Sequence, residues 1–356
     1  MAENTKVQWA DNTFNPWRGC TKVAAGCTNC YADALSKRNP GTLGIWGDNG
    51  TRVVAAEATW REPLKWNKRG AKCRGVVETV FCASLADVFE DWQGPMRDSK
   101  GNELAIGTEL GAGRNLHMDD VRDDLFALID ETPNLRWLLL TKRPGNVRRM
   151  WPTCPRCNGN GRVEMLEHCP SCKGKPGHRS NVALIYSAST QSDLEAGIND
   201  LLACRDLVPT LGLSLEPLVE AIDLQNIGTE KWDVLCGWKG EADNERGWAN
   251  TSWIDWVIVG GESGHGARPC NVEWIRDIVR QCREAGVACF VKQLGAVAVD
   301  GECPSCGGIG FGDSEDCTDC GGDGFEYVEV TDPKGGEPAE WPEDIRVREF
   351  PWEAAS

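Results

Sequence analysis

The sequence has no apolar run long enough to span a bilayer, and its first residues show no signal-peptide pattern. Positive charge is also scarce, because 38 lysines and arginines stand against 54 aspartates and glutamates and give a formal net charge of −16. Such a surface repels a phosphate backbone, so broad nonspecific binding to nucleic acid is disfavoured, although a local basic groove is compatible with the composition. We therefore expect a cytoplasmic protein with no membrane partner.

A fourth metal ligand is missing beside the first three cysteines. Cys20, Cys27 and Cys30 have the spacing C-x6-C-x2-C, and no further cysteine or histidine lies nearby in the sequence. A structural zinc site is closed by four protein ligands, whereas three thiolates suit a [4Fe–4S] cluster whose fourth iron binds a small molecule. The alternatives are a zinc site with a distant fourth ligand and cysteines that serve only in packing. The spacing favours iron–sulfur over zinc.

Eighteen cysteines in a chain expected in the cytosol indicate metal sites rather than disulfides. Two inserts each contain a pair of C-x2-C turns, which is a strong zinc signal. They contribute Cys154, Cys157, Cys169 and Cys172 in residues 152–179, and Cys303, Cys306, Cys317 and Cys320 in residues 296–326. Local pairing gives one Zn²⁺ per insert, and pairing between the inserts is the alternative. The turns resemble the zinc knuckles of DnaJ-type cochaperones in motif, and we expect a structural role, with partner or nucleic-acid contact second.

Apolar runs alternate with amphipathic helical segments along the chain. The expected strands lie at 7–9, 76–84, 135–141, 182–187, 210–215, 256–259 and 288–291, and the expected helices start at 31 or span 118–132, 146–151, 192–204 and 273–285. Near-continuous apolar strands are typical of a parallel sheet covered on both faces, and the alternation indicates βαβ units.

The sequence therefore predicts an α/β fold: a full or partial (β/α) barrel of about six to seven parallel strands with two inserted zinc-knuckle loops. A doubly wound open sheet is the alternative. The barrel domain would occupy residues 1–295, interrupted by the insert at 152–179. The second knuckle at 296–326 and an acidic, proline-containing C-terminal tail at 327–356 would follow.

Polar side chains follow the ends of the predicted strands repeatedly. They are Asp87, Lys142, Arg143, Gln191, Glu216, Glu262, Lys292 and Gln293. Taken singly, each is compatible with a solvated loop residue. The active sites of α/β barrels are built from the loops at the carboxyl ends of the strands, so together with the cysteine loop these residues predict a pocket.

Six stretches of sequence carry a family resemblance. They are residues 15–32 (NPW-x-GC…GC-x-NCYA), 140–144 (LTKRP), 213–217 (LSLEP), 256–264 (WVIVGGESG), 266–269 (GARP) and 290–295 (FVKQLG). In combination they resemble the phage gene-product-37/gene-product-68 family, also called three-Cys-motif proteins, over most of residues 5–295. The function of that family is largely unassigned, and it is regarded as similar to radical S-adenosylmethionine (SAM) enzymes.

Three features depart from these patterns. Radical-SAM enzymes usually have the spacing C-x3-C-x2-C, whereas the first gap here is six residues. Residues 187–191 read SASTQ where relatives usually carry a run like Val-Glu-Asn-Gln, and the two cysteine inserts are additions.

The resemblance implies that Cys20, Cys27 and Cys30 hold a [4Fe–4S] cluster and that SAM binds its fourth iron. One electron would split SAM, and the resulting 5′-deoxyadenosyl radical would abstract a substrate hydrogen. A phage setting suggests a nucleotide or nucleic acid as substrate, the cytosol of the host cell as location, and flavodoxin or ferredoxin as electron donor.

The same resemblance implies roles for the polar residues at the strand ends. Residues that would hold the methionine ammonium or the ribose hydroxyls are Glu216, Gly260, Gly261, Glu262 and Ser263, where the glycines allow close backbone approach. Residues that would meet a carboxylate or phosphate are Lys142, Arg143, Arg268 and Lys292. Glu216, Lys142 and Lys292 are the candidate catalytic residues.

Two other classes of function compete with this one. The chain is alternatively a non-catalytic interaction protein, in which the three-Cys loop is a zinc or redox-sensing site and the knuckles bind a partner. A weaker alternative is a hydrolase with Glu216 and Glu262 as acid and base, supported only by their shared position after strands.

Overall fold

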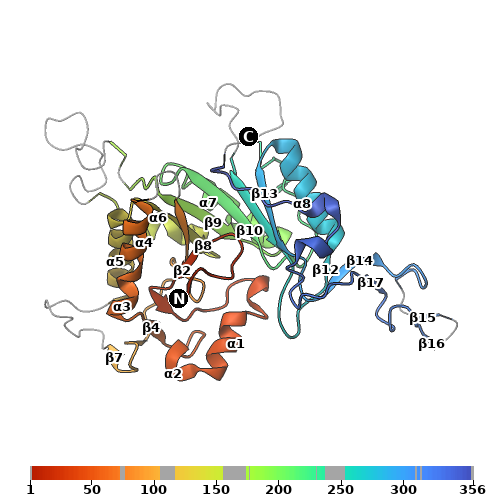
Figure 1. The fold of residues 1–356 in the computed structure, drawn as a ribbon, viewed down its shortest axis with the longest axis horizontal. Coiled ribbons are helices and arrows are strands. Elements are labelled where there is room, and N and C mark those ends of the chain that lie inside the picture. The colour runs from red at the N-terminus through yellow and green to blue at the C-terminus, as the bar shows by residue number, and fades with distance from the viewer. Residues whose placement is uncertain are drawn as a thin grey trace. The chain divides into compact units, whose positions relative to one another are not determined.

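The structure is a computed structural model that describes residues 2–72, 77–104, 117–154, 174–175, 177–229, 231–236, 253–308, 311–312 and 315–353 (Figure 1). It divides into two compact units. Unit 1 comprises Met1–Val23, Cys30–Tyr186 and Gly197–Leu211, and unit 2 comprises Ala24–Asn29, Ser187–Ala196 and Gly212–Ser356.

The α-helices are α1 (Tyr31–Arg38), α2 (Pro40–Leu43), α3 (Glu57–Trp60), α4 (Glu62–Gly70), α5 (Met118–Glu131), α6 (Pro144–Met150), α7 (Gln191–Leu202) and α8 (Val272–Ala285). Three 3₁₀ turns accompany them: η1 (Ala25–Cys27), η2 (Pro338–Glu340) and η3 (Glu343–Ile345). None of the helices in the described part of the chain combines the length and the apolarity that a bilayer crossing requires.

The main sheet contains β1 (Ala2–Glu3), β2 (Asn12–Phe14), β5 (Glu78–Cys82), β8 (Leu135–Thr141), β9 (Val182–Ser187), β10 (Thr210–Leu215), β11 (Trp256–Gly260) and β13 (Ala288–Gln293). Smaller sheets contain β3 (Trp17–Arg18), β4 (Arg52–Val54), β6 (Met96–Arg97) and β7 (Glu103–Leu104), then β12 (Cys270–Asn271), β14 (Ala298–Glu302) and β17 (Phe325–Tyr327), and finally β15 (Phe311–Gly312) and β16 (Glu315–Asp316).

The order of the main sheet confirms the predicted fold class. Its strands run β1-β2-β5-β8-β9-β10-β11-β13, and apart from the antiparallel edge strand β1, seven parallel strands form the sheet within the described residues. The order follows the chain without reversing, whereas a doubly wound sheet reverses at its switch point. Because β1 and β13 are edges, the fold is a partial α/β barrel rather than a closed one.

The core of unit 1 follows from the apolar runs in its strands. Leu138 and Leu139 on β8 are fully buried, and Trp137 makes an edge-to-face contact with Phe14 of β2 at 5.7 Å between ring centroids. Helix α5 buries Leu125 and its apolar neighbours, and it begins with a capping box in which the backbone N–H of His117 donates to Asp120. Helices α4 and α5 lie side by side (Figure 1).

The core of unit 2 includes the C-terminal segment that the sequence predicts as an acidic tail. The backbone N–H of Val291 on β13 donates to the carbonyl of Val347 at 2.8 Å, so this segment lies along the edge strand. Phe350 and Trp352 pack on Trp256 at 5.6 and 5.2 Å between ring centroids. The segment therefore covers the exposed edge of β13, which otherwise invites pairing with another chain.

Two local predictions are wrong. The first strand is expected at residues 7–9, but the strand is β2 at Asn12–Phe14, where Asn12 donates to Glu78 and the backbone pairs with β5. The side-chain amide N–H of Asn12 and the backbone of both Asn12 and Thr13 thus have partners in β5. Lys292 and Gln293, expected in a loop after the last strand, are the last two residues of β13.

Candidate functional site

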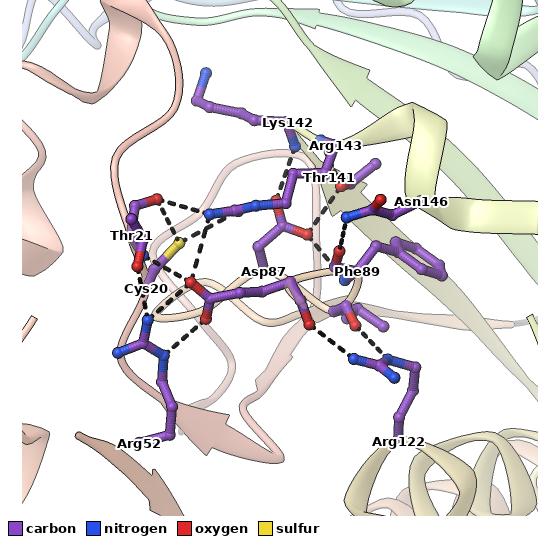
Figure 2. A network of polar contacts seen from close by, with 12 residues as sticks. Cys20, Thr21, Arg52, Asp87, Phe89, Arg122, Thr141, Lys142, Arg143 and Asn146 are labelled. Carbon is purple, nitrogen blue, oxygen red and sulfur yellow. Dashed lines mark hydrogen bonds and ion pairs between the residues drawn. The ribbon is translucent and has the colours of Figure 1, made fainter. Parts of the chain in front are cut away.

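Asp87 organises the carboxyl ends of two strands in unit 1 (Figure 2). It lies five residues after β5, and its carboxylate accepts hydrogen bonds from the hydroxyl of Thr141 at 2.8 Å and the backbone N–H of Lys142 at 3.0 Å. Nη1 of Arg143 donates to the same carboxylate at 2.9 Å. These bonds fix the polar turn that follows β8.

Glu90 and Arg52 form a buried ion pair beside Asp87. Nε and Nη2 of Arg52 approach the two carboxylate oxygens of Glu90 at 2.7 and 2.8 Å, and the two side chains are 0% and 3% exposed. Arg52 also stacks on Trp92 at 3.6 Å from the ring centroid. Glu90 accepts the backbone N–H of Thr21 at 2.8 Å, so this pair holds the chain beside Cys20.

Arg143 contacts the cysteine loop directly. Its Nη1 lies 3.5 Å from Sγ of Cys20, and its Nη2 donates to the carbonyl of Thr21 at 2.8 Å. Burial raises the pKa of the Cys20 thiol to about 12, and the Arg143 cation opposes that rise. Burial alone would lower the pKa of Arg143, but Asp87, Cys20 and Glu90 raise it above its usual value. To bind a cofactor, as the sequence predicts, Arg143 would have to give up some of these contacts within the protein.

Lys142, a candidate catalytic residue, lies next to this network but is not its centre. Its backbone N–H binds Asp87, and its side chain extends away from Asp87 (Figure 2). Lys142 belongs to unit 1, whereas the other candidate catalytic residues, Glu216 and Lys292, belong to unit 2.

In unit 2, Glu262 anchors the turn that contains Cys27. The carboxylate of Glu262 accepts Nη2 of Arg268 at 2.8 Å and Nδ2 of Asn29 at 3.0 Å. Nη1 of Arg268 in turn donates to the carbonyl of Ala25 at 3.2 Å. Burial would raise the pKa of Glu262, but the hydrogen bonds from Arg268 and Asn29 outweigh it and lower the pKa. The charged form of Glu262 therefore holds both ends of η1.

Glu216 and Lys292 face each other at the ends of β10 and β13. Nζ of Lys292 lies 2.8 Å from Oε1 of Glu216, although this buried oxygen accepts no well-aligned hydrogen bond from a described residue. Oε2 of Glu216 accepts a hydrogen bond from the hydroxyl of Ser214 at 3.3 Å. Glu216 and Lys292 are therefore a close pair of opposite charges, in which Oε1 of Glu216 has no well-aligned hydrogen-bond donor among the described residues.

Close packing explains the two glycines at the end of β11, Gly260 and Gly261. A Cβ on Gly261 would lie 2.1 Å from the carbonyl oxygen of Leu294, because the chain after β13 packs against it. A Cβ on Gly260 would lie 3.0 Å from the carbonyl oxygen of Gln293 and 3.3 Å from Oε1 of Glu216. Ser263 follows and is half-buried. Close packing inside unit 2 is therefore sufficient to require glycine at 261.

The three cysteines of the C-x6-C-x2-C loop are divided between the units. Cys20 and Cys30 belong to unit 1 and Cys27 to unit 2, and all three are half-buried thiols. Only Thr28 and Asn29 separate Cys27 from Cys30, so the chain itself limits the distance between their Cα atoms to about 11 Å at full extension. The three-thiol cluster stays a prediction.

The second cysteine insert brings its four thiols together within unit 2. The Sγ atoms of Cys303, Cys306, Cys317 and Cys320 all lie within 4.8 Å of one another. Cys303 and Cys317 are 3.9 Å apart at sulfur, and Cys306 and Cys320 are 3.7 Å apart. A tetrahedral metal with bonds of about 2.3 Å to four sulfurs has edges of about 3.8 Å, so this group is able to hold a metal ion.

Backbone donors complete this four-cysteine group. The N–H of Gly324 donates to Sγ of Cys320 at 3.3 Å, and a Cβ on Gly324 would lie 2.3 Å from the carbonyl oxygen of Gly308. The two glycine turns therefore approach each other closely behind the sulfurs. Burial opposes ionisation of Cys320, but the backbone N–H groups of Gly324 and Gly322 and the neighbouring thiols lower its pKa to about 7.

The first insert lies largely outside the described residues. Cys154 is described and half-buried, whereas Cys157, Cys169 and Cys172 are outside the described residues. Within the described residues, the second insert pairs its turns locally, as the sequence predicts for one of its two alternatives.

Sequence reasoning misses three anchoring residues, of which two belong to unit 1 and one to unit 2. Arg52 is the first residue of β4 and has no local sequence signal, since its partner Glu90 is 38 residues away. Glu90 follows Asp87 by three residues and shares its position after a strand, which is a usable signal. Asn29 lies within the cysteine motif but is 233 residues from Glu262.

The fold and the charged strand ends define an α/β partial-barrel protein with a four-cysteine group that is able to hold a metal ion. The family described as "Protein of unknown function (DUF5131)" matches residues 4–96 and 114–333, and the chain belongs to this family. No curated protein and no solved structure matches the chain.

Proposed function

We propose that the protein is an iron–sulfur enzyme of the radical-SAM-like phage type that acts on a nucleotide or nucleic acid. Cys20, Cys27 and Cys30 would hold a [4Fe–4S] cluster. The substrate class follows from the resemblance to the phage gene-product-37/gene-product-68 family. A reduced flavodoxin or ferredoxin would supply electrons.

One observation carries this proposal: each part of the cysteine loop is anchored by charged side chains at strand ends. Arg143, two residues after β8, contacts Sγ of Cys20 and the carbonyl of Thr21. Glu262, two residues after β11, holds Asn29 directly. Loops at the carboxyl ends of parallel strands are where α/β barrels place their active sites. Simple packing of three cysteines would not require such anchors.

Cysteine thiolates are the usual protein ligands of iron–sulfur clusters, so Cys20, Cys27 and Cys30 are chemically suited to hold one. Three thiols are offered, and the cation of Arg143 beside Cys20 offsets the charge of a thiolate there. A [4Fe–4S] cluster with three protein ligands supplies, when bound, the electron that splits SAM and so starts radical chemistry. The chain's own contribution is to orient the thiols through Arg143, Glu90 and Glu262.

Residues at the strand ends of unit 2 would bind the methionine portion of SAM. Oε1 of Glu216 pairs with Nζ of Lys292 at 2.8 Å, and this carboxylate would exchange that contact for the ammonium group of methionine when SAM binds. Lys292, beside it, would meet a carboxylate. Gly260 lies beside Glu216, and a Cβ there would stand 3.3 Å from Oε1, so a larger residue would crowd this carboxylate.

The test of this proposal is turnover. The anaerobically prepared full chain, given SAM and dithionite, should release 5′-deoxyadenosine and methionine, and Glu216→Gln should weaken SAM binding while leaving the iron content unchanged. An iron-loaded chain that never cleaves SAM would contradict the radical-SAM assignment.

We also propose that the four-cysteine group of the second insert holds Zn²⁺ in a structural role. Four thiolates without a labile position are typical of closed zinc sites, and the ion would pin a hairpin too small to build its own core. This group is also the observation that favours the second candidate function, a metal-binding interaction protein without catalysis.

Replacing one ligand of this group should release its metal. Cys317→Ser should lower the zinc content by about one ion per chain, since three thiolates no longer close a tetrahedral site. Chymotrypsin should then cut more readily at Phe325 and Tyr327 of β17, which follow the last ligand and are already exposed. Metal analysis and mass mapping measure both effects. Ser305→Ala, in the other C-x2-C turn of the group, is the control, and zinc retained in Cys317→Ser would refute the assignment.

A further inference from the structure

We propose that Arg143 is a positioning residue that holds Cys20 and its following peptide in the conformation needed for cluster ligation. This inference rests on the proposed function. It replaces the predicted role of Arg143 as a direct ligand of the cofactor with a role inside the protein.

The guanidinium of Arg143 is fully engaged by groups of unit 1 (Figure 2). Nη1 contacts Sγ of Cys20 at 3.5 Å and Asp87 at 2.9 Å. Nη2 donates to the carbonyl of Thr21 at 2.8 Å and lies 3.4 Å from Glu90. The side chain is 12% exposed, so little of it is available to an incoming ligand.

The base of Arg143 is itself held in place. Its backbone N–H donates to the hydroxyl of Thr141 at 2.9 Å, and that hydroxyl donates to Asp87. Helix α6 begins at the next residue, Pro144. The backbone and both ends of the side chain are therefore fixed, which is the arrangement expected of a residue that orients another.

Only an arginine satisfies these contacts together. Its planar fork donates in several directions at once, whereas a lysine ammonium is a compact charge that cannot bridge the sulfur, the carbonyl and the carboxylate from one position. Two carboxylates, Asp87 and Glu90, balance the two cations, Arg143 and Arg52. The network is thus neutral before the Cys20 sulfur adds its own charge.

Two consequences follow for the cysteine loop. Loss of the fork should free the Cys20–Thr21 peptide, so the thiol becomes easier to modify in the metal-free protein. Loss of the cation should also make a bound cluster harder to reduce, because a nearby positive charge stabilises the more negative reduced state.

The experiment compares Arg143→Gln and Arg143→Lys with a matched control, Arg149→Gln. Arg149 lies on α6, pairs with Asp91 and is 58% exposed, so its replacement removes a cation without touching Cys20. The first readout is the rate at which iodoacetamide alkylates Cys20 in the metal-free full chain, relative to Cys30, measured by mass spectrometry. The second is the reduction potential of the reconstituted cluster.

In Arg143→Lys, which keeps the cation, iodoacetamide should alkylate Cys20 about tenfold faster than in the unmodified chain, the factor that corresponds to about 1.4 kcal/mol of lost restraint. The acceleration should be smaller in Arg143→Gln, because this variant also loses the cation that favours the reactive thiolate. Its cluster should have a lower reduction potential. Arg143→Lys keeps the charge, so its potential should stay closer to that of the unmodified chain while alkylation is still accelerated. Arg149→Gln should change neither quantity.

Unchanged alkylation of Cys20 in both Arg143 variants would overturn the proposal. If Arg143→Gln does not fold, the alkylation rate in Arg143→Lys decides, because that variant retains the buried charge balance. A chain that binds no iron at all would refute the proposed function, yet the alkylation rates of the metal-free protein would still decide the positioning role.

Discussion

Replacing Cys27 with alanine should abolish the brown colour expected of the anaerobic protein and reduce its iron content to background. A methyl group cannot ligate iron, and two remaining thiolates leave the cluster with two open irons. Cleavage of SAM should fall with the iron. Iron analysis and the visible spectrum after reconstitution with iron and sulfide measure the effect, and a product assay for 5′-deoxyadenosine confirms it.

Cys204→Ser is the matched control for this change. Cys204 is fully buried, lies outside every cysteine motif, and its Sγ lies 3.3 Å from the carbonyl of Asp200, a hydrogen bond that serine can repeat. This variant should keep its iron. A Cys27→Ala protein with full iron content would show that Cys27 is not a ligand.

Replacing Arg52 with methionine should destabilise unit 1 by about 3–5 kcal/mol, the cost of leaving a buried charge without its partner. Glu90 would keep only the N–H of Thr21 and the distant Nη2 of Arg143 as donors. The stacking of the guanidinium on Trp92 would also be lost. Urea unfolding, followed by tryptophan fluorescence, measures the free energy.

Arg61→Met provides the contrast, because the ion pair of Arg61 with Glu57 is solvent-exposed. An exposed pair of this kind contributes about 0.3–0.5 kcal/mol on a helix. Equal effects of the Arg52 and Arg61 substitutions would contradict the description of a desolvated network around Glu90.

The main sheet could be predicted because its strands are buried on both faces. Residues 135–141, 182–187 and 210–215 are predicted as strands and are β8, β9 and β10 with the same bounds. Their near-continuous apolar runs leave few alternatives. Strand β2 has no such apolar run, because it contains polar Asn12. The side-chain amide N–H of Asn12 donates to Glu78, 66 residues along the chain, and the local sequence gives no sign of this partner.

The anchors of the cysteine loop could be predicted only in part. Arg143 and Glu262 stand out because each follows an apolar strand, but the partner of Arg143 at Cys20 is 123 residues away. Arg52 gives no local signal, because its importance comes from Glu90 and Trp92. The packing of the C-terminal segment is equally hard to predict from sequence, because Nε1 of Trp256 donates to the carbonyl of Glu349, which lies 93 residues away in the chain.

The metal content of the full chain, purified without oxygen, decides whether Cys20, Cys27 and Cys30 hold an iron–sulfur cluster. The account predicts about four irons per chain with broad absorbance near 400 nm, together with about two zinc ions for the two cysteine inserts. Zinc alone, with no iron bound even after reconstitution, would contradict the radical enzyme and leave a metal-stabilised interaction protein.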